Sequence, residues 1–215
     1  LYDGGIAWLK SGELNDNQAL AGSEETVTEK ALSTGSFRRN QPGDVLLAMY
    51  GATIGKVAIL AEPAVTNQAV CGCTPFEGVF NRYLFRYLLS QRARFHSASE
   101  GGAQPNISKV KIVAFPFPLP PLAEQKRIVA KVDELMALCD RLEAQQQERD
   151  EQASALARAS LARFAEAPTS ANLNPLFHKS YSISPADLRK AILTLAVRGK
   201  LVSQDAKDES AARLL

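Results

Sequence analysis

The stretch Phe115-Pro-Phe-Pro-Leu-Pro-Pro-Leu-Ala-Glu-Gln125 separates two kinds of sequence. Before it, glycines punctuate a series of short apolar runs, whereas after it neither glycine nor proline occurs until Pro168. Proline fixes φ and lacks a backbone donor, so Pro116 to Pro121 must be extended and cannot pair inside a sheet. We therefore expect a stiff hinge between a first domain, residues 1–121, and a long helix, residues 122–166.

Apolar runs bounded by turn residues predict the strands of the first domain. The run at residues 45–50 follows the turn signature Pro42-Gly-Asp44, and a tight connection at residues 51–55 leads to a second run at 56–61. With so short a connection, these two runs are expected to form a hairpin. Residues 69–74 predict a third strand.

The remainder of the first domain has weaker signals. Residues 1–40 are expected to be mostly loop. Asn81 is a candidate N-cap for a helix that Gly101-Gly102 would end. Residues 109–115 alternate enough in polarity to predict a last strand. The expected domain is therefore mixed, with more sheet than helix.

After the hinge, apolar residues recur in alternating steps of four and three, which is the heptad pattern of a coiled coil. The pattern weakens at Gln146 and Arg149 and resumes at Ala153. A continuous helix over residues 122–165 would be roughly 65 Å long at about 1.5 Å per residue, and its apolar stripe requires a partner helix. The residues expected to pair are Ile128, Val132, Leu135, Cys139, Leu142 and Leu156.

The last segment, residues 167–215, is predicted to contain a linker at 167–182 and then a short helix. Ser184 suits its N-cap, Pro185 its first position, and Gly199 its end. The predicted fold class is α+β: a mixed, strand-rich domain, then a long coiled-coil α-helix and a short C-terminal helical segment.

Composition favours a cytoplasmic protein that does not cross a membrane. There is no run of about 18 apolar residues and no signal peptide. The spacing of Cys71 and Cys73 suits neither a disulfide nor a zinc knuckle, so we expect small buried side chains in a reducing compartment. A net charge of +2 neither excludes nor favours a nucleic-acid partner. The first residue is Leu1, inside what resembles a domain, and we expect an N-terminal truncation.

The sequence predicts neither a catalytic nor a metal-binding site. Gly51-Ala-Thr-Ile-Gly-Lys56 resembles a phosphate-binding loop, but that motif needs four residues between its glycines and a Ser or Thr where Val57 stands. His96 and His178 lie on different segments, and no Ser or Cys constellation surrounds them. We therefore expect a protein that is not an enzyme.

Polar side chains in the expected loops are the remaining candidates for binding. Asn and Gln can donate and accept in one plane, which suits adenine edges, while Arg and Lys suit guanine edges or phosphates. From spacing alone, solvated turn residues are the better explanation, and Asn67 and Asn106 especially suit turns. The candidates are Lys10, Ser11, Arg38, Arg39, Thr53, Asn67, Gln68, Gln104 and Asn106.

Several segments, in order along the chain, resemble one family. They are residues 43–59 (Gly-Asp-Val-Leu-Leu-Ala-Met-Tyr-Gly-Ala-Thr-Ile-Gly-Lys-Val-Ala-Ile), 66–70 (Thr-Asn-Gln-Ala-Val), 101–108 (Gly-Gly-Ala-Gln-Pro-Asn-Ile-Ser) and 118–128 (Pro-Leu-Pro-Pro-Leu-Ala-Glu-Gln-Lys-Arg-Ile). Together they resemble a target-recognition domain of type I restriction–modification specificity subunits. Residues 188–202 resemble a segment that the family repeats before a recognition domain.

The resemblance implies a non-catalytic DNA-recognition subunit. Such a subunit holds two recognition domains, each for one half of a split double-stranded site, and antiparallel helices between them set the spacer. The helices also dock the modification (methyltransferase) subunits, which work with restriction subunits. The resemblance implies no cofactor in this chain, and S-adenosylmethionine on the methyltransferase partner. Because only one recognition domain is present, we expect a fragment or a natural half-subunit that pairs with a second half or forms a homodimer through the long helix.

Under this resemblance the loop residues become candidate DNA contacts. The expected base contacts are Asn67, Gln68, Gln104 and Asn106, the expected phosphate contacts are Lys10, Arg38, Arg39 and Lys56, and Ser11, Tyr50 and Thr53 complete the set. Two alternatives remain open. One is a coiled-coil assembly module whose first domain binds protein, and the other is the specificity segment of a single-chain restriction–methyltransferase.

Overall fold

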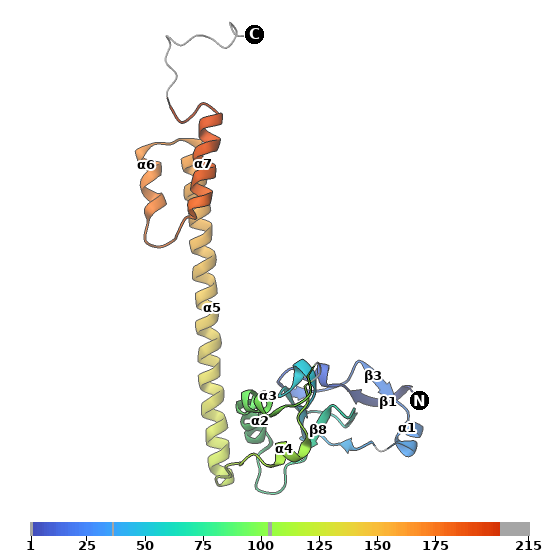
Figure 1. The fold of residues 1–215 in the computed structure, drawn as a ribbon. Coiled ribbons are helices and arrows are strands. Elements are labelled where there is room, and N and C mark those ends of the chain that lie inside the picture. The colour runs from blue at the N-terminus through green and yellow to red at the C-terminus, as the bar shows by residue number, and fades with distance from the viewer. Residues whose placement is uncertain (1, 36, 103–104, 203–215) are drawn as a thin grey trace, which may run out of the picture. The chain divides into compact units, whose positions relative to one another are not determined.

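The computed structural model describes residues 2–35, 37–102 and 105–202. The chain divides into two compact units, Leu1–Leu135 and Met136–Leu215. The boundary falls inside the long helix α5 (Leu122–Glu166), so the first turns of this helix cluster with the strand-rich domain. Figure 1 shows the helices and strands of both units.

The first unit contains two four-stranded sheets. One sheet has the order β3 (Glu25–Val27), β1 (Tyr2–Leu9), β7 (Ala64–Thr66) and β4 (Arg39–Asn40). The other has the order β2 (Asn17–Leu20), β6 (Val57–Leu60), β5 (Val45–Ala48) and β8 (Val70–Cys73). Strand β1 is parallel to β7, and β2 is parallel to β6, whereas β5 is antiparallel to both of its neighbours.

The predicted hairpin is confirmed. Strands β5 and β6 pair antiparallel with Val45 opposite Ile59, and the 3-10 turn η2 (Gly51–Thr53) lies between them. The predicted third strand is also confirmed, as β8 pairs with β5. All four residues of β5 are buried because both faces of this sheet are covered. One face packs on Phe85, Phe95 and Ile107, among others, and the opposite face on Leu9 and Leu14.

The prediction that residues 1–40 are mostly loop is wrong. This segment holds β1, β2, β3, β4 and the helix α1 (Glu29–Thr34). Strand β1 depends on partners on both sides, and one of them, β7, comes much later in the chain. Its sequence also contains Gly4, where a Cβ would lie 2.2 Å from the carbonyl oxygen of Val27. The glycine that suggests a loop is therefore required by close strand packing.

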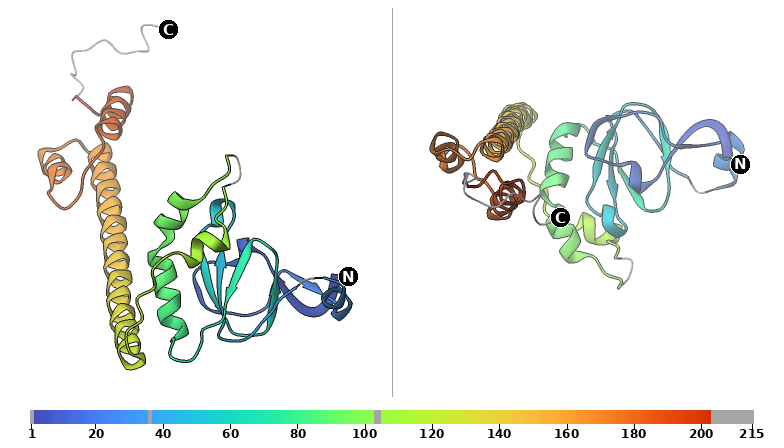
Figure 2. Two further views of the ribbon diagram at one scale, coloured as in Figure 1. Left: turned by 60° about the horizontal axis from the view of Figure 1, so that its bottom comes forward. Right: turned by 90° about the horizontal axis from the view of Figure 1, so that it is seen from above.

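Two helices cover one face of the β2–β6–β5–β8 sheet (Figure 2), where a single helix was predicted. They are α2 (Asn81–Ser90) and α3 (Arg92–Ala98), which meet at Gln91. The predicted N-cap is displaced by one residue: Phe80 is the N-cap, and Asn81 is the first helical residue.

The predicted strand at residues 109–115 is wrong, because residues 109–113 form the short helix α4 (Lys109–Val113). Ser108 caps this helix by accepting a hydrogen bond from the Lys111 N–H at 3.3 Å. Ile112 and Phe115, which lie three residues apart, pack on the core, whereas Val110 is exposed. The apolar residues thus use a helical spacing that so short a window does not distinguish from alternation.

The hinge is held by side chains of α2. The Tyr83 hydroxyl donates to the carbonyl oxygen of Pro118 at 3.1 Å, and the Tyr87 hydroxyl donates to that of Pro116 at 2.9 Å. The ring of Phe117 contacts both tyrosine rings, with centroids 5.8 and 4.8 Å away. The proline-rich segment therefore satisfies its carbonyl groups without joining a sheet.

The predicted long helix is confirmed as α5. Gln125, in its first turns, is fully buried and makes three hydrogen bonds. Its Oε1 accepts from the N–H of Phe80 at 2.9 Å, and its Nε2 donates to the carbonyls of Gly78 and Pro120, each at 2.8 Å. Two turns later, Asp133 forms ion pairs with α2.

The second unit packs shorter helices on the end of α5. They are α6 (Ser170–Leu173), the 3-10 turn η3 (Asn174–Phe177) and α7 (Pro185–Val197). Phe164, Leu176 and Leu195 are buried together. Residues 167–182 are therefore not simply a linker. Ser170 begins α6, and Asn174 and Pro175 are the first two residues of η3. The predicted cap of α7 is confirmed, since Ser184 accepts from Ala186.

Among the residues that the structure describes, no helix is both long enough and apolar enough to cross a membrane. The longest, α5, carries charged side chains along its length.

We predict that Gln125→Ala lowers the free energy of unfolding by about 2–3 kcal/mol, because it removes a fully buried side chain and leaves the N–H of Phe80 and two carbonyl groups without their partner. Urea denaturation measures the change. The control is Gln145→Ala, on the exposed middle of the same helix, which should change stability by less than about 0.5 kcal/mol. Equal effects of the two substitutions would contradict this role for Gln125.

Candidate functional site

Most of the predicted binding residues gather at one end of the two sheets. Because β1 and β7 are parallel and Leu9 is paired with Thr66, Lys10 and Asn67 leave the sheet side by side. The N–H of Asn67 donates to the carbonyl of Leu9 at 3.1 Å, which joins the two loops. Ser11 follows in the 3-10 turn η1 (Ser11–Glu13).

Backbone hydrogen bonds join two more loops to this end. The N–H of Met49, just after β5, donates to the carbonyl of Ala69 at 2.8 Å. The N–H of Gly51 donates to Pro105 at 2.8 Å, and that of Ile107 donates to Met49 at 3.0 Å. A β-bridge also pairs Tyr50 with Asn106. We define residues 10–16, 49–56, 66–69 and 105–107 as the loop cluster.

The side chains of the loop cluster differ in how free they are. Gln68 and Asn106 are exposed. Asn67 is half-buried, and its Oδ1 accepts from the N–H of Ala69 at 3.2 Å, a local contact that also fits a turn-forming role. Thr53 donates to the carbonyl of Tyr50 at 2.8 Å. The side chains of Asn67 and Thr53 therefore help to set the conformation of the loops, whereas those of Gln68 and Asn106 are exposed.

The two lysines of the loop cluster have different partners. Lys10 forms an ion pair with Glu25, and its ammonium lies 5.6 Å from the centre of the Trp8 ring. The hydrogen bond to Glu25 raises the pKa of Lys10 above its usual value. The ammonium of Lys56 instead donates to the neutral amide oxygen of Asn15 at 2.8 Å. Within the described part of the chain, no carboxylate forms an ion pair with Lys56.

Asn15 and Asp16 belong to the loop cluster, although the sequence did not predict them as site residues. Asn15 bonds to Lys56, and Asp16 accepts from the N–H of Val57 at 3.2 Å and from Arg92 at 2.5 Å. The polar run at residues 11–17 marks a turn in the sequence. Its contact with β6, however, depends on pairing between distant segments, which the sequence pattern does not reveal.

Arg38 and Arg39 do not join the loop cluster. Strand β8 is antiparallel to β5 with Cys73 opposite Val45, so residues 72–74 lie at the other end of β5 from Tyr50. Arg38 donates there to the carbonyl of Gly72 at 2.7 Å and to the hydroxyl of Thr74, and it lies 3.8 Å from the buried Asp44.

Arg39 lies in β4, with its guanidinium 3.6 Å from Glu29. Gln104 is outside the described residues. The DNA contacts expected of these residues remain predictions.

The two cysteines of β8 face the core together and are half-buried. A hydrogen bond from the Cys73 thiol lowers the pKa of Cys71 to about 6, although burial of the thiol acts to raise it. The positive charges of Lys109 and Arg38 also lower the pKa of Cys71. The described residues contain no group of three or more His, Cys, Asp or Glu side chains arranged to hold a metal ion.

The family model for the type I restriction modification DNA specificity domain matches residues 2–151. The chain is 32% identical over 159 residues to the EcoAI specificity subunit of Escherichia coli, covering 66% of this chain and 26% of that protein. It is 32% identical over 134 residues to the MjaIX specificity subunit of Methanocaldococcus jannaschii, covering 59% of this chain and 30% of that protein. The chain thus matches about a quarter to a third of the length of these curated relatives.

Solved structures share the fold. The HsdS subunit from Thermoanaerobacter tengcongensis superimposes with a TM-score of 0.54 at 21% identity, over 67% of this chain and 33% of that one. A chain from a study of complex assembly and conformational transition in the type I R-M system also gives 0.54, at 20% identity, over 67% of this chain and 34% of that one. Both are similar in their mixed, strand-rich architecture.

We predict that Arg38→Ala lowers the free energy of unfolding by about 1–2 kcal/mol, because it removes two hydrogen bonds and the cation nearest to the buried Asp44. Thermal or urea denaturation measures it. Arg39→Ala is the matched control, since its ion pair joins two exposed side chains and should contribute less than about 0.5 kcal/mol. A larger loss of stability for Arg39→Ala than for Arg38→Ala would contradict the structural role given to Arg38.

Proposed function

This chain belongs to the type I restriction–modification DNA specificity family, and from that membership we propose that it recognises DNA sequence. In this proposal the first unit recognises one half of a split, double-stranded site through the loop cluster. The observation that carries the proposal is the convergence of four loops, from distant parts of the chain, onto one end of the sheets.

The loop cluster has the chemistry for base recognition. Asn and Gln side chains offer a donor and an acceptor in one plane, which matches the major-groove edge of adenine. Gln68 and Asn106 are exposed, and we propose them, with Asn67 and Gln104, as base contacts. Backbone hydrogen bonds between the loops limit their freedom, so less conformational entropy is lost on binding.

Lys56 is the strongest candidate for a phosphate contact. Its ammonium has only a neutral amide as its hydrogen-bond partner among the described residues, so a phosphate can replace that amide without breaking an ion pair. Lys10 would first have to leave Glu25, and Arg38 and Arg39 lie away from the loop cluster. We therefore rank Lys56 above these three cations as a phosphate contact.

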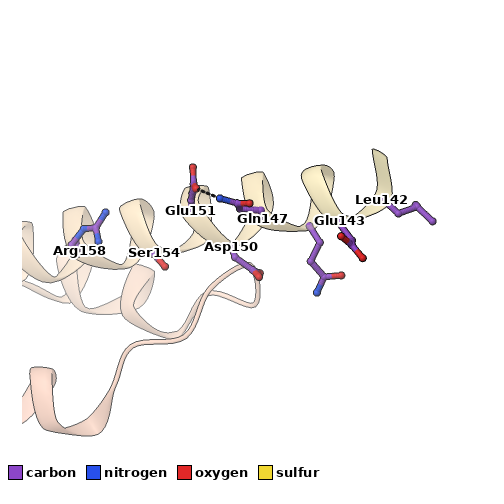
Figure 3. A pocket seen from close by; sticks show the side chains of 8 residues that line it. Leu142, Glu143, Gln147, Asp150, Glu151, Ser154 and Arg158 are labelled. Atoms are coloured by element: carbon purple, nitrogen blue, oxygen red, sulfur yellow. Dashed lines mark hydrogen bonds between the residues drawn. The ribbon is translucent and has the colours of Figure 1, made fainter. Parts of the chain in front are cut away.

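The long helix supplies a surface for a second recognition half. Leu135, Leu142 and Leu156 of the predicted pairing set are about half exposed, with exposed fractions of 48%, 58% and 51%. Figure 3 shows the α5 face from Leu142 to Arg158, where the labelled side chains other than Leu142 are polar or charged. Ile128 and Val132 are half-buried, and Cys139 is exposed. A second copy or a second recognition half would remove the three exposed leucines from water.

We further propose that α5 docks the methyltransferase subunits of a complex that also contains restriction subunits. Catalysis and S-adenosylmethionine binding would then belong to those partners, and this chain would catalyse nothing. A role in assembly alone would not explain why four polar loops converge at one end of the sheets, so we favour DNA recognition over the coiled-coil assembly module. A single-chain enzyme would need catalytic segments beyond these residues.

We predict that Lys56→Ala weakens DNA binding by a similar factor on all sequences and flattens the slope of log affinity against log salt by about one unit, because one phosphate contact is lost. Fluorescence anisotropy on duplexes at several salt concentrations measures this. Asn106→Ala should instead weaken discrimination at one base pair by about 1–3 kcal/mol with an unchanged salt slope. If both variants kept the original binding profile, the loop cluster would not be the DNA-binding surface.

We predict that the 215-residue chain forms a dimer at micromolar concentration and that the double substitution Leu135→Glu and Leu142→Glu makes it monomeric, since charges in an apolar seam oppose pairing. Light scattering measures the mass of both forms. Glu134→Gln with Arg141→Gln, at exposed positions one residue away, serves as the control and should leave the mass unchanged. A monomeric unsubstituted chain would contradict pairing of two copies through α5.

A further inference from the structure

The carboxylate of Asp133 accepts hydrogen bonds from two arginines on one face of α2. Its Oδ2 accepts from Nη2 of Arg82 at 2.8 Å, and its Oδ1 accepts from Nη2 of Arg86 at 2.5 Å. The arginines are four residues apart, so they lie one above the other on α2. Both oxygens of a single carboxylate are thus used to fix one helix against another.

The arginines also connect this carboxylate to the sheet that contains β5 and β6. Arg82 donates to the amide oxygen of Gln18, in β2, at 2.5 Å. On its other face, α2 places Phe85 and Leu88 in the core cluster with Val45 and Val57. Strands β5 and β6 end in the loop of residues 49–56. A continuous series of packed elements therefore leads from the loop cluster through α2 to Asp133.

Asp133 differs from Gln125 in what its loss would do. Gln125 is fully buried and satisfies backbone groups, so its removal affects folding. The side chains of Asp133 and Arg86 are 28% and 18% exposed, and no backbone group bonds to the Asp133 carboxylate among the described residues. Its contacts restrict how α2 and α5 turn about each other, while the hinge and Gln125 keep them attached.

We propose that Asp133 is a positioning residue that holds the recognition domain at a fixed orientation to α5 and so selects the spacer length between two DNA half-sites. This inference rests on the proposed function, because it assumes that the loop cluster binds DNA and that two recognition halves are joined through α5. Asp133 itself does not touch the DNA. A change of orientation displaces the loop cluster along and around the duplex, where one base pair adds about 3.4 Å and rotation follows the helical repeat of 10–10.5 base pairs.

The test is a selection of split sites from a random duplex library by the full 215-residue chain, followed by affinity measurements on the selected site with its spacer lengthened or shortened by one base pair. The variant Asp133→Asn keeps the shape of the side chain and removes its charge. We expect it to select the same bases and to bind an isolated half-site as the unsubstituted chain does. Its preference for the best spacer should fall about fivefold, which corresponds to roughly 1 kcal/mol.

Two further variants make the test specific. Arg86→Gln breaks the same ion pair from α2 and should reproduce the weaker spacer preference. Asp140→Asn makes the same chemical change seven residues later, at an exposed position without an ion pair among the described residues, and should retain the original preference.

An unchanged spacer preference in both Asp133→Asn and Arg86→Gln would overturn the proposal. So would an equal loss of affinity for an isolated half-site, which would show an effect on binding and not on orientation. If the unsubstituted chain selected a single undivided motif, only the positioning proposal would fail. Selection of no motif at all would remove the proposed function as well.

Discussion

The buried amide of Gln125 is the interaction on which the arrangement of the first unit depends. The four prolines of the hinge lack backbone N–H donors and cannot pair inside a sheet, so side chains must hold this segment. Gln125 does this with both ends of its amide, bonding to the hinge at Pro120 and to the loop before α2 at Gly78 and Phe80. Because Gln125 lies on α5, the start of the long helix becomes part of the strand-rich domain.

That attachment gives the loop cluster a defined support. The loops leave β1, β5 and β7 at one end of the two sheets, and the sheet that contains β5 is covered on both faces by apolar side chains. Helix α2 contributes to one of these covers and also carries Arg82 and Arg86, which bind Asp133. The loop cluster, the core and helix α5 are therefore connected through side chains of α2. Such a scaffold suits recognition, where loops must be held in place by a rigid body.

Local sequence patterns predicted the elements whose stability is mainly local. The hairpin of β5 and β6, the helix α5 and the cap of α7 are of this kind, since turn residues, heptads and Ser184-Pro185 act over short distances. Strand β1 was missed because its parallel partner β7 is remote, and Gly4 resembles a loop residue until Val27 is placed beside it. Residues 109–115 were predicted as a strand because so short a segment fits the alternation of a strand as well as the spacing of a helix.

The same distinction applies to the candidate site. Asn67 and Lys56 were named as separate candidates because they are polar and lie in expected loops, and only the strand pairing brings them to one end of the sheets. Asn15 and Asp16 reach the same place only through contacts across the chain. Arg38 carries the charge expected of a phosphate contact, yet its guanidinium is bonded at the other end of β5. Residue type alone does not reveal which partner a side chain has.

Amide hydrogen exchange at Phe80 reports on the attachment of α5 to the first unit, because this N–H donates to the Gln125 side chain. We expect the Phe80 amide to exchange as slowly as the core amides of α2, although the residue precedes the helix. Exchange at the rate of an unprotected amide, with α2 itself protected, would contradict it and show that α5 is not fixed to the domain by Gln125.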